Sequence, residues 1–203
     1  MAAVYSQKLT SLSSWANLLQ SAAVQVVALG IVRRGANFIF PTGSAHFAVA
    51  SPSTFNFGYS SEAVYASLDT LGAFSCLLLT IVVLANFVLI ASNAFNLSAL
   101  TSIGLKAVGL STPPASQLNL LPLAAAGAHI VENLLFLLIV ATGVHSNALA
   151  GLAGTISIVR DVLGAASVAV VAGTLPVFLC EWAKSIGRDG RQRVNHVQMQ
   201  KVE

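Results

Sequence analysis

Four long apolar runs dominate the pattern of apolar and polar positions along this chain. A helix that crosses the roughly 30 Å hydrocarbon core of a bilayer needs about 20 apolar residues, because each residue adds about 1.5 Å. The clearest run, 71–92, holds no charged residue in 22 positions, and 120–143 is interrupted by His129 and Glu132. The pattern therefore predicts four membrane-spanning helices, at approximately residues 13–32, 71–92, 120–143 and 150–182.

The first and the last of these runs allow more than one arrangement. Residues 13–32 carry Gln20 and Gln25 but no charge, which fits either a spanning helix or an amphipathic helix on the membrane surface. Residues 150–182 would measure about 50 Å as one straight helix, which is longer than the hydrocarbon core. Since this run contains Pro176, we expect it either to cross the membrane and project or to bend at that proline.

The composition favours a membrane protein over other classes. Of the 203 residues, 56% are apolar and 8% are charged, whereas a soluble domain carries about 25% charged residues. The mean hydropathy of +0.80 excludes a disordered chain, and the two cysteines exclude a disulfide-stapled scaffold. We expect an all-α polytopic membrane protein, a bundle of four transmembrane helices that forms a single domain over residues 1–203.

Positive charge is concentrated in the C-terminal tail, residues 184–203. Basic residues gather on the cytoplasmic side of membrane proteins, so we expect the C-terminus on the cytoplasmic, matrix or stromal side. Four spans then place Arg33 and Arg34 on the opposite side, against this rule. No acidic residue precedes Glu62; this composition is typical of organelle-targeting segments and favours a mitochondrial or plastid inner membrane over the plasma membrane. The tail residues expected to contact lipid headgroups or a partner are Arg188, Arg191 and Arg193.

The loop expected at residues 35–66 is rich in aromatic side chains. Phe55, Phe57 and Tyr59 alternate along it, so their rings can share one face of an extended segment. Aromatic side chains favour the headgroup region of a membrane, and we expect this loop to contact lipid or a partner protein. The expected partners are thus the lipid bilayer, bound lipids and other membrane subunits. We expect no other cofactor, and no nucleic acid, because a few clustered basic residues are a usual membrane anchor.

Ionisable residues inside two predicted spans form a polar cluster. His129, Glu132 and Asn133 share one face of the third helix, at positions i, i+3 and i+4, and Arg160 and Asp161 lie on the fourth helix. In a tight hairpin, Glu132 and Arg160 are equally far from the turn, and both lie roughly 16 Å below it. An unpaired charge at that depth costs at least about 2.5 kcal/mol. We therefore expect Glu132 and Arg160 to pair, with His129 or Asn133 supplying further hydrogen bonds.

The polar cluster has two interpretations. One is a buried ion pair that fixes the register of two helices, and the other is a relay for protons or ions. His129 and Glu132 offer two metal ligands in the reverse of the usual order, and no second histidine lies at a matching depth to hold haem. The sequence therefore predicts no metal site.

The segment from His129 to Asn133, followed by an apolar run and Arg160, resembles the membrane-associated proteins of eicosanoid and glutathione metabolism. In that family one helix carries a polar residue three positions before a Glu, and a later helix carries an Arg. The resemblance covers roughly residues 71–170 and implies a small membrane-embedded enzyme or carrier that uses His129, Glu132 and Arg160. The chain departs from the family pattern in three places, since it lacks a basic residue at 125–128, a Tyr after Arg160 and a further spanning run after Trp182.

Small residues at helical spacing mark the fourth predicted helix. Ala165, Ala169 and Gly173 recur at i, i+4 and i+8 and would let two helix backbones approach closely. We expect a helix–helix contact along this small-residue row, with the partner helix either in this chain or in another subunit. The sequence contains no phosphate-binding loop, nucleophile elbow or zinc-protease motif. We therefore expect a non-catalytic subunit of a larger membrane complex with a structural, assembly or lipid-contact role, and a membrane enzyme or carrier is the competing hypothesis.

Overall fold

The computed structural model describes residues 2–12, 14–39, 61–69, 71–143 and 145–199, and these parts of the chain are helical without any strand. Four helices within them are long and apolar enough to cross a membrane, which confirms the all-α fold predicted from the apolar runs. These candidate spans are Ala16–Ile39, Ala73–Ala107, Ala115–Thr142 and Asn147–Cys180. In chain order the elements are α1 (Ala2–Leu12), α2 (Trp15–Ile39), α3 (Ser61–Leu68), α4 (Ala73–Ala107), the 3-10 helix η1 (Ala115–Leu120), α5 (Leu121–Thr142) and α6 (Asn147–Met199).

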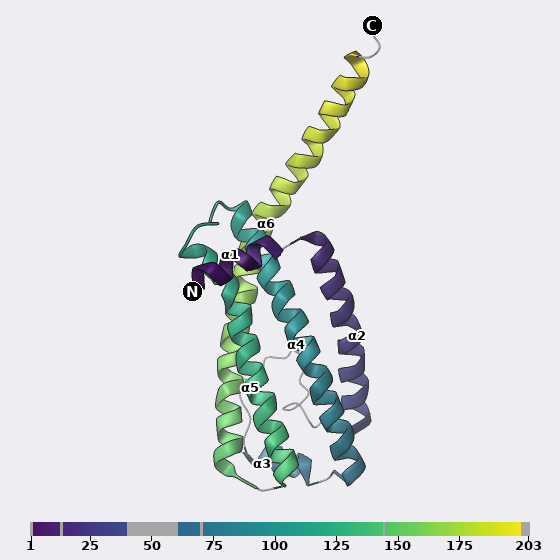
Figure 1. Cartoon of the computed structure of the whole chain (residues 1–203), viewed down its shortest axis with the longest axis vertical. Helices are drawn as coiled ribbons and strands as arrows, with labels where there is room; N and C mark the ends of the chain where they lie inside the picture. The colour runs from purple at the N-terminus through teal and green to yellow at the C-terminus, as the bar shows by residue number, and fades with distance from the viewer. Residues whose placement is uncertain (1, 13, 40–60, 70, 144, 200–203) are drawn as a thin grey trace.

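The bundle is organised around α4 (Figure 1). Helices α4, α5 and α6 pack against one another, and α2 packs along α4. The core consists mainly of aliphatic side chains such as Leu79, Val83 and Ile139, which are almost completely buried. The outer faces are apolar as well: Phe74, for example, exposes 68% of its surface. A bundle that is apolar on both its inner and its outer faces is suited to lipid as its solvent.

Two short helices close the two ends of the bundle. At one end, α1 crosses the bundle, where Ser6 Oγ donates a hydrogen bond to the Ser116 carbonyl and Asn119 Nδ2 donates to the Ser6 carbonyl at 3.1 Å and to Ser102 Oγ at 2.9 Å. Buried polar groups that satisfy one another in this way hold α1, η1 and α4 together. The N-terminal helix α1 and the extension of α6 lie at the same end of the bundle (Figure 1), the arrangement that four spans require.

At the other end, α3 packs against the start of α6 beside the turn between α5 and α6. The ring of Tyr65 stacks on His145 with centroids 4.2 Å apart. The Tyr65 hydroxyl accepts a hydrogen bond from the Ser146 amide at 2.6 Å and donates to the Ser146 carbonyl at 2.9 Å. Gly143 ends α5 with a left-handed φ of 61°, a conformation that favours glycine and closes the helix tightly. This turn makes α5 and α6 the predicted hairpin.

Several boundaries differ from those predicted. The helix predicted at 71–92 runs from Ala73 to Ala107, because the polar residues that follow the apolar run, such as Ser98, Thr101 and Ser102, are buried within the bundle. Both ends of the loop predicted at 35–66 are helical instead, since α2 reaches Ile39 and α3 begins at Ser61. Residues 40–60, with Phe55, Phe57 and Tyr59, lie outside the described parts of the chain.

The last helix extends well beyond the range predicted for it. The helix predicted at 150–182 begins at Asn147 and runs to Met199. Of the two arrangements considered, α6 projects from the bundle as one continuous helix that includes Pro176 (Figure 1). The tail predicted at 184–203 is thus helical over most of its length.

Candidate functional site

The polar cluster lies on the facing sides of α5 and α6. On α5, His129, Glu132 and Asn133 are all buried, because their i, i+3, i+4 spacing puts them on the face that meets the rest of the bundle. On α6, the consecutive residues Arg160 and Asp161 lie at the same depth in the bundle as Glu132. The hairpin turn therefore brings residues 28 positions apart into one layer of the bundle.

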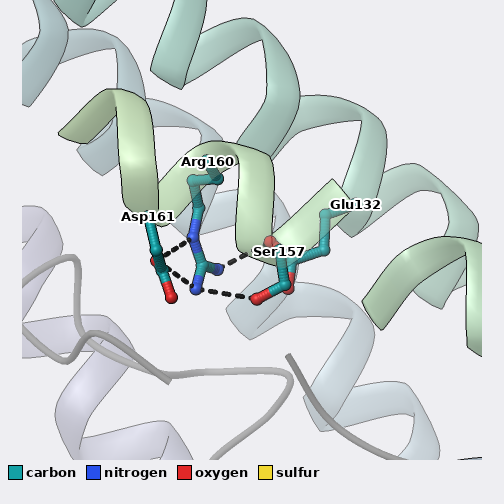
Figure 2. A network of polar contacts seen from close by, with 4 residues as sticks. All are labelled: Glu132, Ser157, Arg160 and Asp161. Carbon is teal, nitrogen blue, oxygen red and sulfur yellow. Dashed lines mark hydrogen bonds and ion pairs between the residues drawn. The ribbon is translucent and has the colours of Figure 1, made fainter. Parts of the chain in front are cut away.

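Arg160 lies at the centre of a hydrogen-bond network with Glu132, Ser157 and Asp161 (Figure 2). Its Nη1 donates to Glu132 Oε2 at 2.6 Å, across the α5–α6 interface. Its Nε donates to Asp161 Oδ1 at 2.8 Å, and its Nη2 donates to Ser157 Oγ at 3.0 Å. Each of the three guanidinium nitrogens thus has an acceptor, so the positive charge that Arg160 carries into the bundle is hydrogen-bonded on all sides of the guanidinium that these nitrogens define.

The Arg160 network, meaning Arg160 with Glu132, Asp161 and Ser157, is buried and compact. The side chains of Arg160, Glu132 and Asp161 expose 11%, 3% and 5% of their surface. Low-dielectric surroundings strengthen the attraction among these groups and also raise the cost of removing any one of them. The network has one guanidinium and two carboxyl groups, and the sequence of the two spans contains no other Lys or Arg.

Ser157 completes the network where His129 or Asn133 was predicted to do so. His129 makes no hydrogen bond to any residue that the structure describes, and Asn133 Nδ2 also lacks a partner there. Sequence reasoning missed Ser157, although a hydroxyl three residues before an arginine on one helix is within reach of it. Among the described residues there is no group of three or more His, Cys, Asp or Glu that could hold a metal ion.

A crevice between α4, α5 and α6 reaches one side of the network. Its volume is about 80 Å³, which is room for two or three water molecules at roughly 30 Å³ each. It is bordered by apolar residues of all three helices and by a polar group that includes three members of the polar cluster. These polar lining residues are Asn93, His129, Arg160, Asp161 and Ser167.

A second polar contact, which sequence reasoning missed, connects α2 to α4. Asn96 Nδ2 donates to Gln25 Oε1 at 2.7 Å, and Gln25 Nε2 donates to Asn93 Oδ1 at 3.3 Å. Asn86 lies deeper on α4, and neither polar atom of its buried side chain has a partner in the described parts of the chain. Asn93 and Asn96 fell just beyond the predicted end of the second apolar run, so the sequence placed them in a loop.

The small-residue row of α6 faces away from the bundle. Ala165, Ala169 and Gly173 are all exposed, and a Cβ added to Gly173 would meet no atom within 4 Å. The close approach that α6 does make is on its other side, where a Cβ on Gly104 of α4 would overlap the side chain of Thr174. Within the described chain, the row therefore has no partner helix.

The remaining predicted contact residues are positioned only in part. Arg188, Arg191 and Arg193 lie in the projecting part of α6, and their side chains are outside the described structure. Comparison of the chain with protein-family models, with curated proteins and with solved structures gives no match. The arrangement of the described residues supports a polytopic membrane protein in contact with the lipid bilayer, by the length and apolar character of its four candidate spans.

Proposed function

We propose that this chain is a non-catalytic integral subunit of a larger membrane complex, in the inner membrane of a mitochondrion or plastid. The observation that carries the proposal is the projection of α6, which continues about 28 Å past the end of its candidate span at Cys180. Most helical stability in proteins comes from tertiary packing. In Figure 1 this part of α6 runs away from the other helices, so a second protein is the natural source of that packing.

The outward face of α6 supports the same proposal. In lipid, helices associate through close packing of small residues rather than through the hydrophobic effect. Ala165, Ala169 and Gly173 lie on the exposed face, which is the position for contact with a helix of another subunit. In this proposal the Arg160 network fixes the register of α5 and α6, so that both the row and the projecting helix are held at a defined angle.

The proposal is tested by the native mass of the gently solubilised protein, together with mass spectrometry of the proteins that co-migrate. We expect migration at many times the 21.0 kDa of the chain, with distinct partner proteins. Ala169→Leu, which fills the row, should release the chain from the complex. Ala141→Leu adds the same three carbons to an exposed alanine of α5 and should leave the complex intact. Migration of the wild-type protein as a monomer would contradict the proposal.

The crevice favours a second candidate function, a carrier or relay that uses the polar cluster. Its polar lining and its room for a few water molecules fit the passage of protons or small ions rather than of a larger substrate. The test is proton flux into liposomes that contain the purified chain and a pH-sensitive dye. Ala126→Leu would fill the crevice without removing any member of the Arg160 network. If the chain is a relay, the wild-type protein should show proton flux and this change should abolish it. If the wild-type protein shows no flux, the relay is excluded and the structural role is the remaining candidate.

A further inference from the structure

An aliphatic groove runs along the outer surface between α2 and α4. It has a volume of about 380 Å³, and every residue that lines it is Ala, Val or Ile. The two helices touch beyond both ends of the groove: Gly35 packs against Val82, where an added Cβ would overlap the valine, and Ser21 Oγ donates to the Ser92 carbonyl at 3.3 Å. The groove is therefore a bounded depression. Its lining residues are Ala23, Val24, Val27, Ala28 and Ile31 of α2 with Ala85 and Val88 of α4.

One basic side chain lies on the groove's side of α2, beyond its last lining residue. Arg34 follows Ile31 by three residues and Val27 by seven, so it lies on the same face of the helix. Arg33 precedes it by one position and is therefore turned by about 100° around the helix axis, away from the groove. Both arginines are exposed. Of the two, Arg34 alone is aligned with the groove.

The depth of Arg34 in the bundle calls for an anion near its guanidinium. Arg34 lies about 10 Å from the middle of the candidate span Ala16–Ile39, whereas half of the hydrocarbon core measures about 15 Å. Its backbone would thus lie about 5 Å inside the hydrocarbon edge, and its long side chain can extend to the phosphate level. No acidic residue precedes Glu62 in the sequence, so α2 supplies no carboxylate to neutralise this charge.

The length of the groove suits one acyl chain. From Ile31 to Ala23 the groove extends about 12 Å along α2, from about 5 Å on the Arg34 side of the middle of the candidate span to about 7 Å past that middle. An extended acyl chain that starts at the hydrocarbon edge, about 15 Å from the middle, would fill the groove by reaching a short way into the other leaflet. A phosphate at Arg34 would accept paired hydrogen bonds from the guanidinium. The acyl chain of the same molecule would then descend along Ile31, Val27 and Ala23.

We propose that Arg34 and the aliphatic groove form a binding site for one phospholipid with an anionic headgroup. The headgroup phosphate binds Arg34, and one acyl chain occupies the groove between α2 and α4. The positive charge of Arg34, for which α2 supplies no carboxylate, selects a lipid with net negative charge over a zwitterionic one. This site does not depend on membership of a larger complex, because all of its residues belong to this chain.

The test is photo-crosslinking of the purified full-length chain in phosphatidylcholine vesicles. The probe is phosphatidylglycerol with a diazirine in one acyl chain, and labelled positions are mapped by mass spectrometry of peptides. We expect labelling concentrated at Ala23–Ile31 and at Ala85 and Val88. Arg34→Gln should lower this labelling about five-fold, the effect of one basic residue near an anionic surface. The matched control Arg33→Gln, one position away, should lower it by less than about two-fold, because that side chain faces away from the groove.

A second variant tests the groove separately from the charge. Val27→Phe fills the groove and leaves Arg34 in place, and it should lower labelling by the phosphatidylglycerol probe. In the wild-type protein, a phosphatidylcholine probe should label the groove less than the phosphatidylglycerol probe does. The proposal would be overturned by labelling that spreads evenly over other exposed apolar positions, such as Leu134 and Val162, or by equal effects of the two arginine variants. The proposal would also be overturned if, in native membranes, the Val27→Cys variant formed a disulfide with a cysteine of another protein. A partner helix would then occupy the groove. Circular dichroism of each variant establishes that its helices are retained.

Discussion

Arg160 of α6 donates a hydrogen bond to Glu132 of α5 over 2.6 Å, and the same guanidinium also holds Asp161 and Ser157. The arginine thus connects the two helices of the hairpin and neutralises one of two buried carboxylates. Removing the arginine and removing the whole set of charges should therefore have very different effects on stability.

We expect Arg160→Leu to lower the free energy of unfolding by about 3–5 kcal/mol, because it leaves two carboxylates buried without a cation. The combined change Glu132→Leu, Arg160→Met and Asp161→Leu should cost far less, since no charge then remains in the layer. Both proteins would be measured by denaturant titration in detergent. An equal loss in the single and triple variants would show that the network does not act as an ion pair.

Asn119 is expected to hold the N-terminal helix to the bundle. Asn119→Ala leaves the Ser6 carbonyl and the Ser102 hydroxyl without their shared donor, which should cost about 1–3 kcal/mol. Hydrogen exchange should rise throughout α1. The control is Asn37→Ala at an exposed position of α2; if it raised exchange in α1 equally, the clamp would not depend on Asn119.

The close approach of α4 and α6 depends on Gly104. Gly104→Ala forces its new methyl group against Thr174 and should destabilise the protein by about 1–3 kcal/mol. Gly127 of α5 has open space around its Cβ position, so Gly127→Ala should instead gain about 0.5–1 kcal/mol from the helix backbone. Thermal unfolding of the two variants compares them directly, and a shift of the same sign in both would argue against close packing at Gly104.

Tyr65 attaches α3 to the hairpin turn through its hydroxyl group. Tyr65→Phe keeps the ring that stacks on His145 but loses both hydrogen bonds to Ser146. Because each lost hydrogen bond costs about 1 kcal/mol, α3 should detach more often from the turn. Its amide hydrogens should therefore exchange faster, while those of α5 stay protected. Tyr5→Phe, at a side chain that is 61% exposed, serves as the control. Unchanged exchange in α3 would mean that the stacked ring alone holds it.

The sequence was most informative about the charged residues inside the predicted membrane spans. The depth of Glu132 and Arg160 follows from counting residues to the turn, because a hairpin in lipid leaves a charged pair little freedom. The spacing of Ser157 and Arg160 on one helix also carried a signal, but the contacts of Asn93 and Asn96 were not predictable in this way. They depend on how each helix is rotated about its axis, and an apolar run that faces both core and lipid carries almost no signal of that rotation.

The predicted helix boundaries were wrong for a related reason. The apolar run that predicts a span ends where polar residues begin, yet α4 continues through them because Ser98, Thr101 and Ser102 are buried against other helices. Asn119 directly precedes the run predicted at 120–143, and its side chain binds Ser6 and Ser102. The partner in that contact lies 113 residues away in the sequence, which no local pattern encodes.

Because α6 is continuous, its projecting part is rigidly connected to the part that packs inside the bundle. Thr174 packs against Gly104 of α4, and the last turn of α6 at Met199 lies about 38 Å further along the axis. At this length, a tilt of about 10° in the projecting part would move its far end by about 7 Å. Small differences in how the bundle holds α6 would thus be amplified along the projecting helix.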